Sequence, residues 1–142
     1  MEQFEYTFTV GMDRQAIDER LQTAEIGVLS LADGDDAYGI PLAYHWDGES
    51  FVFRLGDHPA SDKMAFIDST DRASFLVFEY RSPEDSWSVL ATGRLRPLEQ
   101  AESEALEARE GFIPLRLFGE AVADVEPRLF RLQVEALTGR MV

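Results

Sequence analysis

The sequence contains no cysteine, which excludes disulfide bonds, thiolate nucleophiles and cysteine-based metal sites. It has no apolar run near the roughly 20 residues that a membrane-spanning helix needs. The residues that follow Met1 lack the basic and apolar regions of a signal peptide. No Ser-His-Asp order, glycine-rich phosphate loop or paired-acid pattern stands out. Because the sequence shows neither a membrane-spanning nor a signal segment, we expect a cytoplasmic protein. Because it shows no catalytic pattern, we assign no catalytic side chain.

Lysine is nearly absent, because Lys63 stands alone beside twelve arginines and 27 acidic residues. The formal net charge of −14 would repel the phosphates of duplex nucleic acid. Self-repulsion of this kind strains a compact fold unless salt screens it, and the Debye length falls to roughly 3 Å at 1 M salt. The composition therefore favours a halophilic protein over an ordinary acidic one.

Hydrophobic periodicity and turn residues predict one domain over residues 1–142, without internal repeats. Strands are expected at 25–32, 37–46, 49–55, 72–80, 86–98 and 129–137, and helices at 12–23, 61–69 and 99–110. Residues 112–125 are ambiguous and are interpreted as a short helix or 3₁₀ turn. Six strands joined by hairpins, with helices inserted between them, indicate a mainly β (α+β) fold. We expect a small antiparallel barrel, since closing the sheet removes its exposed edges.

Single residues within these segments carry further predictions. Asp13 is the expected N-cap of the first helix. Asp47-Gly48 indicates a hairpin turn. Pro41 cannot donate a hydrogen bond within a strand, so it indicates an edge, a bulge or a ligand-facing break. Gly93 indicates a bend or a close approach of another backbone.

The segment from Arg54 to Lys63 could bind an anion. Strand alternation places Arg54 on the face opposite Phe53. A helix that begins at Ser61 would offer free N–H groups and the positive end of its dipole, which suit a phosphate. Arg54 could add a forked contact and Lys63 a point charge. The alternative interpretation is a surface arginine, an N-cap serine and a solvated lysine.

Two apolar segments could hold a flat ring, namely 38–44 and 87–93. Backbone groups freed around Pro41, and the hydroxyl of Ser88, could bind the edge of a heterocycle. Core and edge packing is the alternative interpretation of both segments. The two histidines, His45 and His58, show no metal-ligand spacing, so no metal site is predicted.

In their order and spacing these segments resemble the FMN-binding split-barrel superfamily, the pyridoxamine 5′-phosphate oxidase-like proteins. Gly27-Val28-Leu29-Ser30 is similar to the family's first barrel strand, and the segment from Tyr38 to Tyr44 to its proline-containing second strand. Phe51-Val52-Phe53-Arg54 resembles the third strand, and Ser61-Asp62-Lys63 the step into a helix. Trp87-Ser88-Val89 resembles the long strand. The segment from Val134 to Arg140 is similar to the closing strand of the branch that includes nitroimidazole-resistance-type proteins.

The resemblance implies a six-stranded antiparallel split barrel and a homodimer that holds FMN at the subunit interface. Arg54, Ser61 and Lys63 would hold the phosphate, with Phe53 in the same strand as Arg54. The ring would be lined by the backbone of Ile40, Pro41, Leu42 and Ala43, together with Ser88 and Val89. FMN is expected rather than FAD.

Four functions remain open at this point. The chain could be a flavin-dependent oxidoreductase of unknown substrate, although it has no convincing copy of the oxidase's C-terminal substrate-binding arginine and histidine. It could be a flavin-binding or storage protein without turnover. It could be a relative that binds a deazaflavin or haem. It could also be an interaction module without a cofactor.

Overall fold

The computed structural model describes residues 9–57, 63–108 and 126–142. Within these ranges the elements are β1 (Val10–Gly11), α1 (Arg14–Thr23), β2 (Ile26–Asp33), β3 (Asp36–Trp46), β4 (Ser50–Asp57), α2 (Lys63–Ser69), β5 (Ala73–Ser82), β6 (Asp85–Pro97), α3 (Gln100–Glu107) and β7 (Glu126–Met141). All six predicted strands are present, and β7 is longer than expected. The ambiguous segment 112–125 and the predicted N-cap Ser61 lie outside the described residues.

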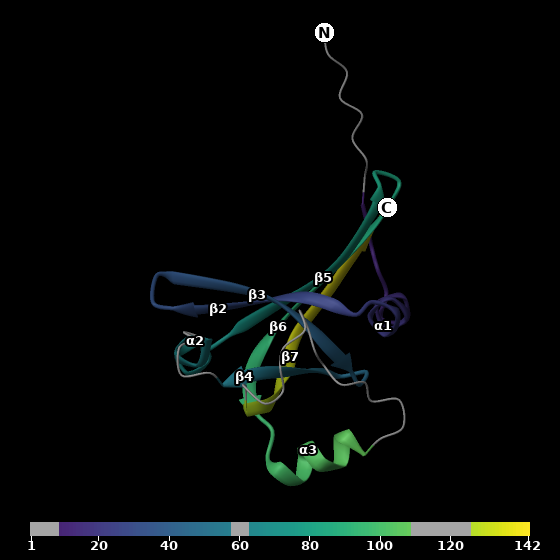
Figure 1. Cartoon of the computed structure of the whole chain (residues 1–142). Coiled ribbons are helices and arrows are strands. Elements are labelled where there is room, and N and C mark those ends of the chain that lie inside the picture. The colour runs from purple at the N-terminus through teal and green to yellow at the C-terminus, as the bar shows by residue number, and fades with distance from the viewer. Residues whose placement is uncertain (1–8, 58–62, 109–125) are drawn as a thin grey trace.

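Six of the strands close into an antiparallel barrel in the order β7-β4-β3-β2-β5-β6, with β6 returning to β7. The expected barrel is therefore confirmed. Strand β7 closes it by pairing with β4 through Glu126–Gln133 and with β6 through Phe130–Met141. The short β1 extends the sheet at the far end of β7, and the sequence analysis did not predict it. The β5–β6 hairpin and the end of β7 project from the barrel as an arm (Figure 1).

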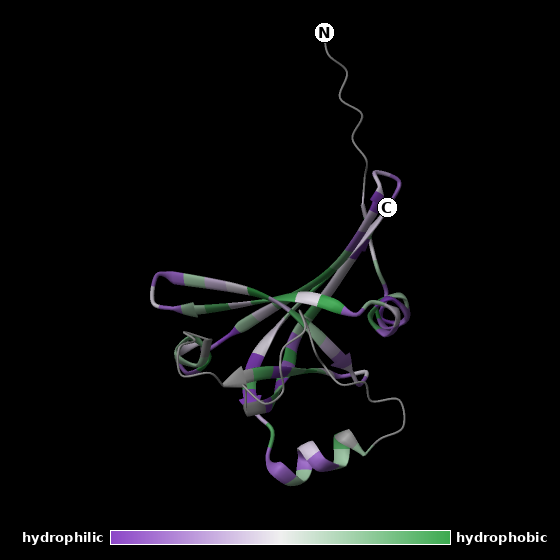
Figure 2. Ribbon diagram, viewed as in Figure 1, coloured by the Kyte–Doolittle hydropathy of each residue, from purple (hydrophilic) through white to green (hydrophobic). Residues whose placement is uncertain are grey.

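The core fills the barrel interior, because alternate residues of each strand point inward. Phe51, Phe53 and Phe75 are fully buried there, and the rings of Phe53 and Phe75 lie 4.6 Å apart between centroids. Helix α1 begins at its predicted N-cap, since the Ala16 N–H donates to Asp13 Oδ1 at 2.8 Å. Figure 2 shows hydrophobic residues concentrated along the strands and hydrophilic ones at the hairpin tips. Because apolar side chains fill the interior, a binding site for a small molecule would lie on the outer wall of the barrel.

Helix α1 packs on the core through Ile17 and Leu21, both buried. The Tyr44 hydroxyl donates to the Leu21 carbonyl oxygen at 2.8 Å, which ties the helix to β3. Among the described helices, none is long and apolar enough to cross a membrane.

Candidate functional site

Arg54 lies on the outer wall of the barrel, as strand alternation predicted. Its neighbours Phe53 and Leu55 point into the core, so Arg54 points outward and is half-buried, with its Nη2 atom out of contact with solvent. The pairing between β3 and β4 ends at Tyr44 and Phe53. Ala43 and Arg54 are the next residues on these two strands, and both lie on the outward face.

Helix α2 follows β4 after a short connection and is anchored on the barrel. Its Ile67 enters the core, and its Phe66 ring stacks on Tyr38 at 5.1 Å. Thr70, just past the helix end, donates to the Ala32 carbonyl oxygen and accepts from the Ala32 N–H, each at 3.0 Å. The helix begins at Lys63. The Lys63 side chain and Ser61 lie outside what the structure describes, so their predicted contacts with a phosphate stay predictions.

The four predicted ring-lining residues of β3 divide between the two faces of the strand. Leu42 is buried in the core and Ile40 packs against it, whereas Pro41 is exposed and Ala43 half-buried on the outer side. Strand β3 pairs with β4 only from Tyr44 to Trp46, so at Pro41 it is paired with β2 alone. Of the edge, bulge or ligand-facing break predicted at Pro41, the pairing supports the edge, because the backbone on the other side of β3 has no strand against it in the described part of the chain.

Ser88 and Val89 lie on the wall opposite to β3. Strand β6 is three strands away from β3 in either direction around the barrel. Val89 is 0% exposed, so only its backbone can reach a ligand, and the same holds for Phe53 on β4. Ser88 points outward between Phe78 and Arg140. One copy of the chain therefore does not bring Ser88 and Val89 together with the β3 residues.

An apolar row crosses the outer wall between these two regions. The register aligns Pro41, Val28, Leu76 and Leu90 on four adjacent strands. Ile26, Phe78 and Tyr80 extend the same outward face, with Phe78 55% and Tyr80 66% exposed. Large apolar side chains gathered at the surface mark an interaction site more often than single ones do.

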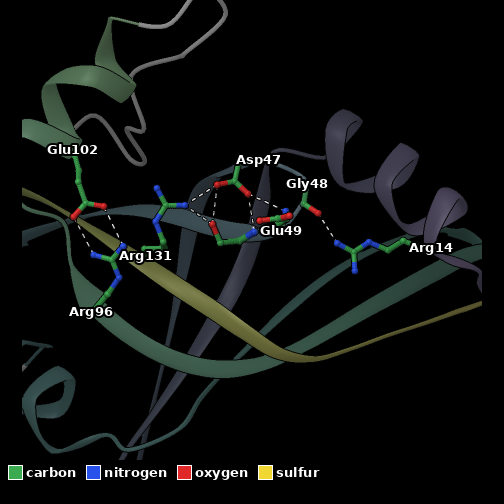
Figure 3. Close-up of polar contacts among 8 residues, drawn as sticks. Arg14, Asp47, Gly48, Glu49, Arg96, Glu102 and Arg131 are labelled. Atoms are coloured by element: carbon green, nitrogen blue, oxygen red, sulfur yellow. Dashed lines mark hydrogen bonds and ion pairs between the residues drawn. The ribbon is translucent and has the colours of Figure 1, made fainter.

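A polar network ties the β3–β4 turn to β7 (Figure 3). Asp47 accepts from Arg131 Nη1 at 2.6 Å, from the Ser50 hydroxyl at 2.8 Å and from the backbone N–H groups of Glu49 and Ser50. Burial alone would raise the pKa of Asp47. The hydrogen bonds from Glu49, Ser50 and Arg131 outweigh it and hold the pKa below its ordinary value. The confirmed Asp47-Gly48 turn, in which Gly48 has φ +97°, is thus fixed in place.

A second ion pair attaches α3 to the same wall. Arg96 on β6 donates from Nη1 and Nη2 to the two carboxylate oxygens of Glu102, at 3.1 and 3.0 Å. The hydrogen bond from Arg96 lowers the pKa of the Glu102 carboxyl. Leu106 of α3 packs on Val52 and Leu129. Helix α3 therefore covers the wall beside Arg54.

The sequence analysis missed one feature of the outer wall, a cavity of 420 Å³. Its lining is formed by Ser30, Leu31, Ala32, Arg72, Ala73, Ser74 and Thr92. Serine and threonine at outward positions of three strands were visible in the sequence. Their meeting in one row depends on the register between strands, which local patterns do not reveal.

No group of three or more metal-binding side chains occurs within the described ranges. His45 lies half-buried on the outward face of β3, and His58 lies outside those ranges. A comparison with curated protein sequences gives no match.

Comparison with solved structures shows the same fold in several proteins. One is provisionally assigned as a pyridoxamine 5′-phosphate oxidase from Corynebacterium glutamicum, with 15% identity and a TM-score of 0.73 over 96% of this chain and 95% of that one. A FAD-binding protein from Mesorhizobium loti shows 18% identity and a TM-score of 0.69 over 94% and 98%. A protein provisionally assigned to 5-nitroimidazole antibiotic resistance, from Bacteroides thetaiotaomicron, shows 13% identity and a TM-score of 0.66 over 99% and 95%.

These likenesses establish the fold, and the sequence itself establishes the family. Residues 13–141 match the family described as pyridoxamine 5′-phosphate oxidase. That match agrees with the resemblance drawn from the strand motifs. The chain therefore belongs to the pyridoxamine 5′-phosphate oxidase family of split-barrel proteins.

Proposed function

We propose that this protein binds FMN as a homodimer and acts as a flavin-dependent oxidoreductase. The observation that carries the proposal is the position of Arg54. In a chain of net charge −14, this half-buried guanidinium points outward from β4, the strand that leads into α2. A guanidinium there suits a phosphate, because its fork can donate two parallel hydrogen bonds.

The residues present fit the phosphate end and one edge of a flavin. Arg54 would hold the phosphate, together with Lys63, where α2 begins, and with Ser61, whose predicted role lies outside the described residues. The backbone of β3 around Pro41, which no strand of the described residues covers on one side, would bind the ring edge. When bound, the flavin supplies the electron-transfer chemistry, while the protein supplies binding and orientation.

FMN is proposed over FAD because the predicted cationic set, Arg54 and Lys63, matches a single terminal phosphate. The FAD-binding protein from Mesorhizobium loti shares the fold at 18% identity, so FAD is the direct competitor. Mass spectrometry of the small molecule released by denaturing the purified protein separates them. Release of FAD, a deazaflavin or haem would contradict the FMN assignment.

The homodimer is proposed from two features of the outer wall. Ser88 lies on the wall opposite β3. It can therefore line a flavin ring only if β3 of a second copy of the chain binds that ring. The row of Pro41, Val28, Leu76 and Leu90 provides an apolar surface between the two regions, in which Pro41 and Leu90 are exposed and Val28 and Leu76 are half-buried. Sedimentation equilibrium should give twice the chain mass, and Leu90→Glu should lower that mass by placing a charge in the contact.

The phosphate assignment is tested with two ligands that differ only in that group. Arg54→Ala and Lys63→Ala should each weaken FMN by about tenfold or more while leaving riboflavin nearly unchanged, since a charge-assisted hydrogen bond contributes about 1.5–3 kcal/mol. Arg81→Ala is the matched control, because Arg81 is exposed at the β5–β6 hairpin. Equal losses for both ligands would refute the assignment.

Oxidoreductase activity is tested separately from binding. Steady-state oxidation of a reduced nicotinamide with an added quinone or nitro acceptor should proceed in the flavin-loaded protein. A loaded protein that bleaches with dithionite but shows no turnover would instead be a binding or storage protein. The cytoplasmic location stays a prediction.

A further inference from the structure

The cavity on the outer wall is lined by three hydroxyl-bearing side chains that lie in one row. Ser30 pairs with Ser74, and Ser74 pairs with Thr92, so the three residues are direct neighbours on β2, β5 and β6. The residues on either side of them, including Leu29, Leu31, Ala73, Phe75 and Ala91, are buried in the core. Strand alternation therefore points all three hydroxyls outward, into the same 420 Å³ cavity.

Arg72 supplies a cation to this cavity. Its Nη2 atom lies 3.5 Å from Thr92 Oγ1, and its Nε atom 4.0 Å from Glu135 Oε1. Both distances are at the outer limit for their kinds of contact. The Arg72 side chain is 57% exposed, so it can turn toward a bound group without leaving a packed position.

Arg72, Arg94 and Glu135 together carry a positive charge, although Asp33 and Asp71 adjoin the lining residues Ala32 and Arg72 in the sequence. Glu135 is shared by two arginines, because Arg94 Nε also lies 3.7 Å from Glu135 Oε1. Two guanidiniums beside one carboxylate leave one positive charge among these three side chains. The cavity lining itself contains no carboxylate among the residues that the structure describes. A small anion is therefore favoured there over a cation.

We propose that Arg72, Ser30, Ser74 and Thr92 form a second ligand site, which binds the oxyanion group of a small molecule. A carboxylate and a phosphate share the chemistry that this row recognises, namely oxygens that accept from a guanidinium fork and from hydroxyls. A volume of 420 Å³ falls within the range of small-molecule sites, about 300–1,000 Å³. The ligand is thus expected to be larger than its anionic group.

The proposal does not depend on flavin binding, because none of the four residues is assigned to the flavin. The site adjoins the row of Pro41, Val28, Leu76 and Leu90, since each Ser or Thr lies two residues from a member of that row. The competing interpretation is a solvated Arg72–Glu135 pair with no ligand. The two interpretations differ in what removing either charge should do.

The test follows backbone amide shifts by NMR in the full chain, titrated with inorganic phosphate or acetate at ionic strength matched with sodium chloride. Saturable shifts at residues 30–32 and 72–74 are expected with at least one of the two anions. Phosphate alone would indicate a phosphate ester, and acetate a carboxylic acid. Shifts that grow linearly with both anions, as with chloride, would overturn the proposal.

Charge variants provide opposite expectations. Arg72→Gln should weaken binding by about tenfold or more, as expected for a lost charge-assisted contact. Glu135→Gln should strengthen binding by roughly two- to fivefold, because it removes an exposed competitor for Arg72. Arg81→Gln, at the distant β5–β6 hairpin, should leave the affinity for phosphate and for acetate unchanged. Unaltered binding in Arg72→Gln, or weaker binding in Glu135→Gln, would also overturn the proposal.

Discussion

Replacing Gly93 by alanine should weaken the pairing of β6 with β7, the seam at which the barrel closes. Gly93 lies where the β6–β7 register shifts between Thr92 and Gly93. A Cβ atom added there would lie 1.9 Å from the Gln133 carbonyl oxygen and 2.8 Å from its carbonyl carbon. Both are backbone atoms of β7, so rotation of a side chain cannot relieve the contact. The close approach that the sequence predicted for Gly93 is thereby confirmed.

The magnitude follows from the required displacement. A carbon and a carbonyl oxygen approach to about 3.3 Å, so the strands must separate locally by about 1.4 Å. Such a shift exceeds the tolerance of hydrogen bonds near 2.9 Å. Losing two ladder bonds in a buried position costs about 1–3 kcal/mol each. We expect Gly93→Ala to lower the free energy of unfolding by about 2–6 kcal/mol.

Urea unfolding followed by tryptophan fluorescence measures this change. Gly39→Ala is the matched control, since an added Cβ on β3 would lie 3.8 Å from Val28 Cγ1, an ordinary contact. Alanine there should be neutral or slightly stabilising, because glycine in a strand loses more entropy on folding. If the two variants differed by less than about 0.5 kcal/mol, the seam would be shown to adapt, and the argument from backbone contact would be wrong.

Three further predictions concern pH and salt. The hydrogen bonds from Glu49, Ser50 and Arg131 lower the pKa of Asp47, so they stabilise the fold above the ordinary pKa of 3.8 and cease to do so as pH falls through the folded-state pKa. Asp47→Asn should cost about 1–2 kcal/mol at pH 7 and should flatten the acid limb of a stability–pH curve. Tyr44→Phe should cost about 1 kcal/mol by removing the bond to Leu21. Burial raises the Tyr44 pKa, so the wild type should lose stability above pH 10.0, and the phenylalanine variant should lose less, when both are measured by thermal unfolding. The net charge of −14 predicts a melting temperature that rises steeply with KCl, and a flat response would contradict the halophilic interpretation.

The strands could be predicted because each carries its own local evidence. Pro41 indicated an edge, a bulge or a ligand-facing break, Gly93 indicated a bend or a close approach, and Asp47-Gly48 indicated a turn. Each of these predictions depends on the chemistry of one or two residues. Strand β1 was missed because two residues contain no period. The full length of β7 was missed because its two halves serve different partners, so its pattern of buried residues changes along the strand.

The candidate site could be predicted only in part. The face of a strand on which a residue lies follows from the local sequence, whereas its neighbours on other strands follow from the strand order and register. Alternation was enough to place Arg54 on the outer wall and Phe53 within the core. Grouping Ser88 with Pro41 required the strand order, which places them on opposite walls of one copy. The row of Ser30, Ser74 and Thr92 joins residues up to 62 positions apart, and no local pattern indicates such a meeting.

The two-sided pairing of β7 has a consequence for synthesis on the ribosome. Until residues 126–141 emerge, β4 and β6 each keep an unpaired edge, and the core between them stays open to water. The nascent chain therefore cannot complete its barrel cotranslationally one hairpin at a time. A chain that ended before residue 126 would lack β7 and leave the barrel open. Such a chain would be prone to aggregate through the unpaired edges of β4 and β6.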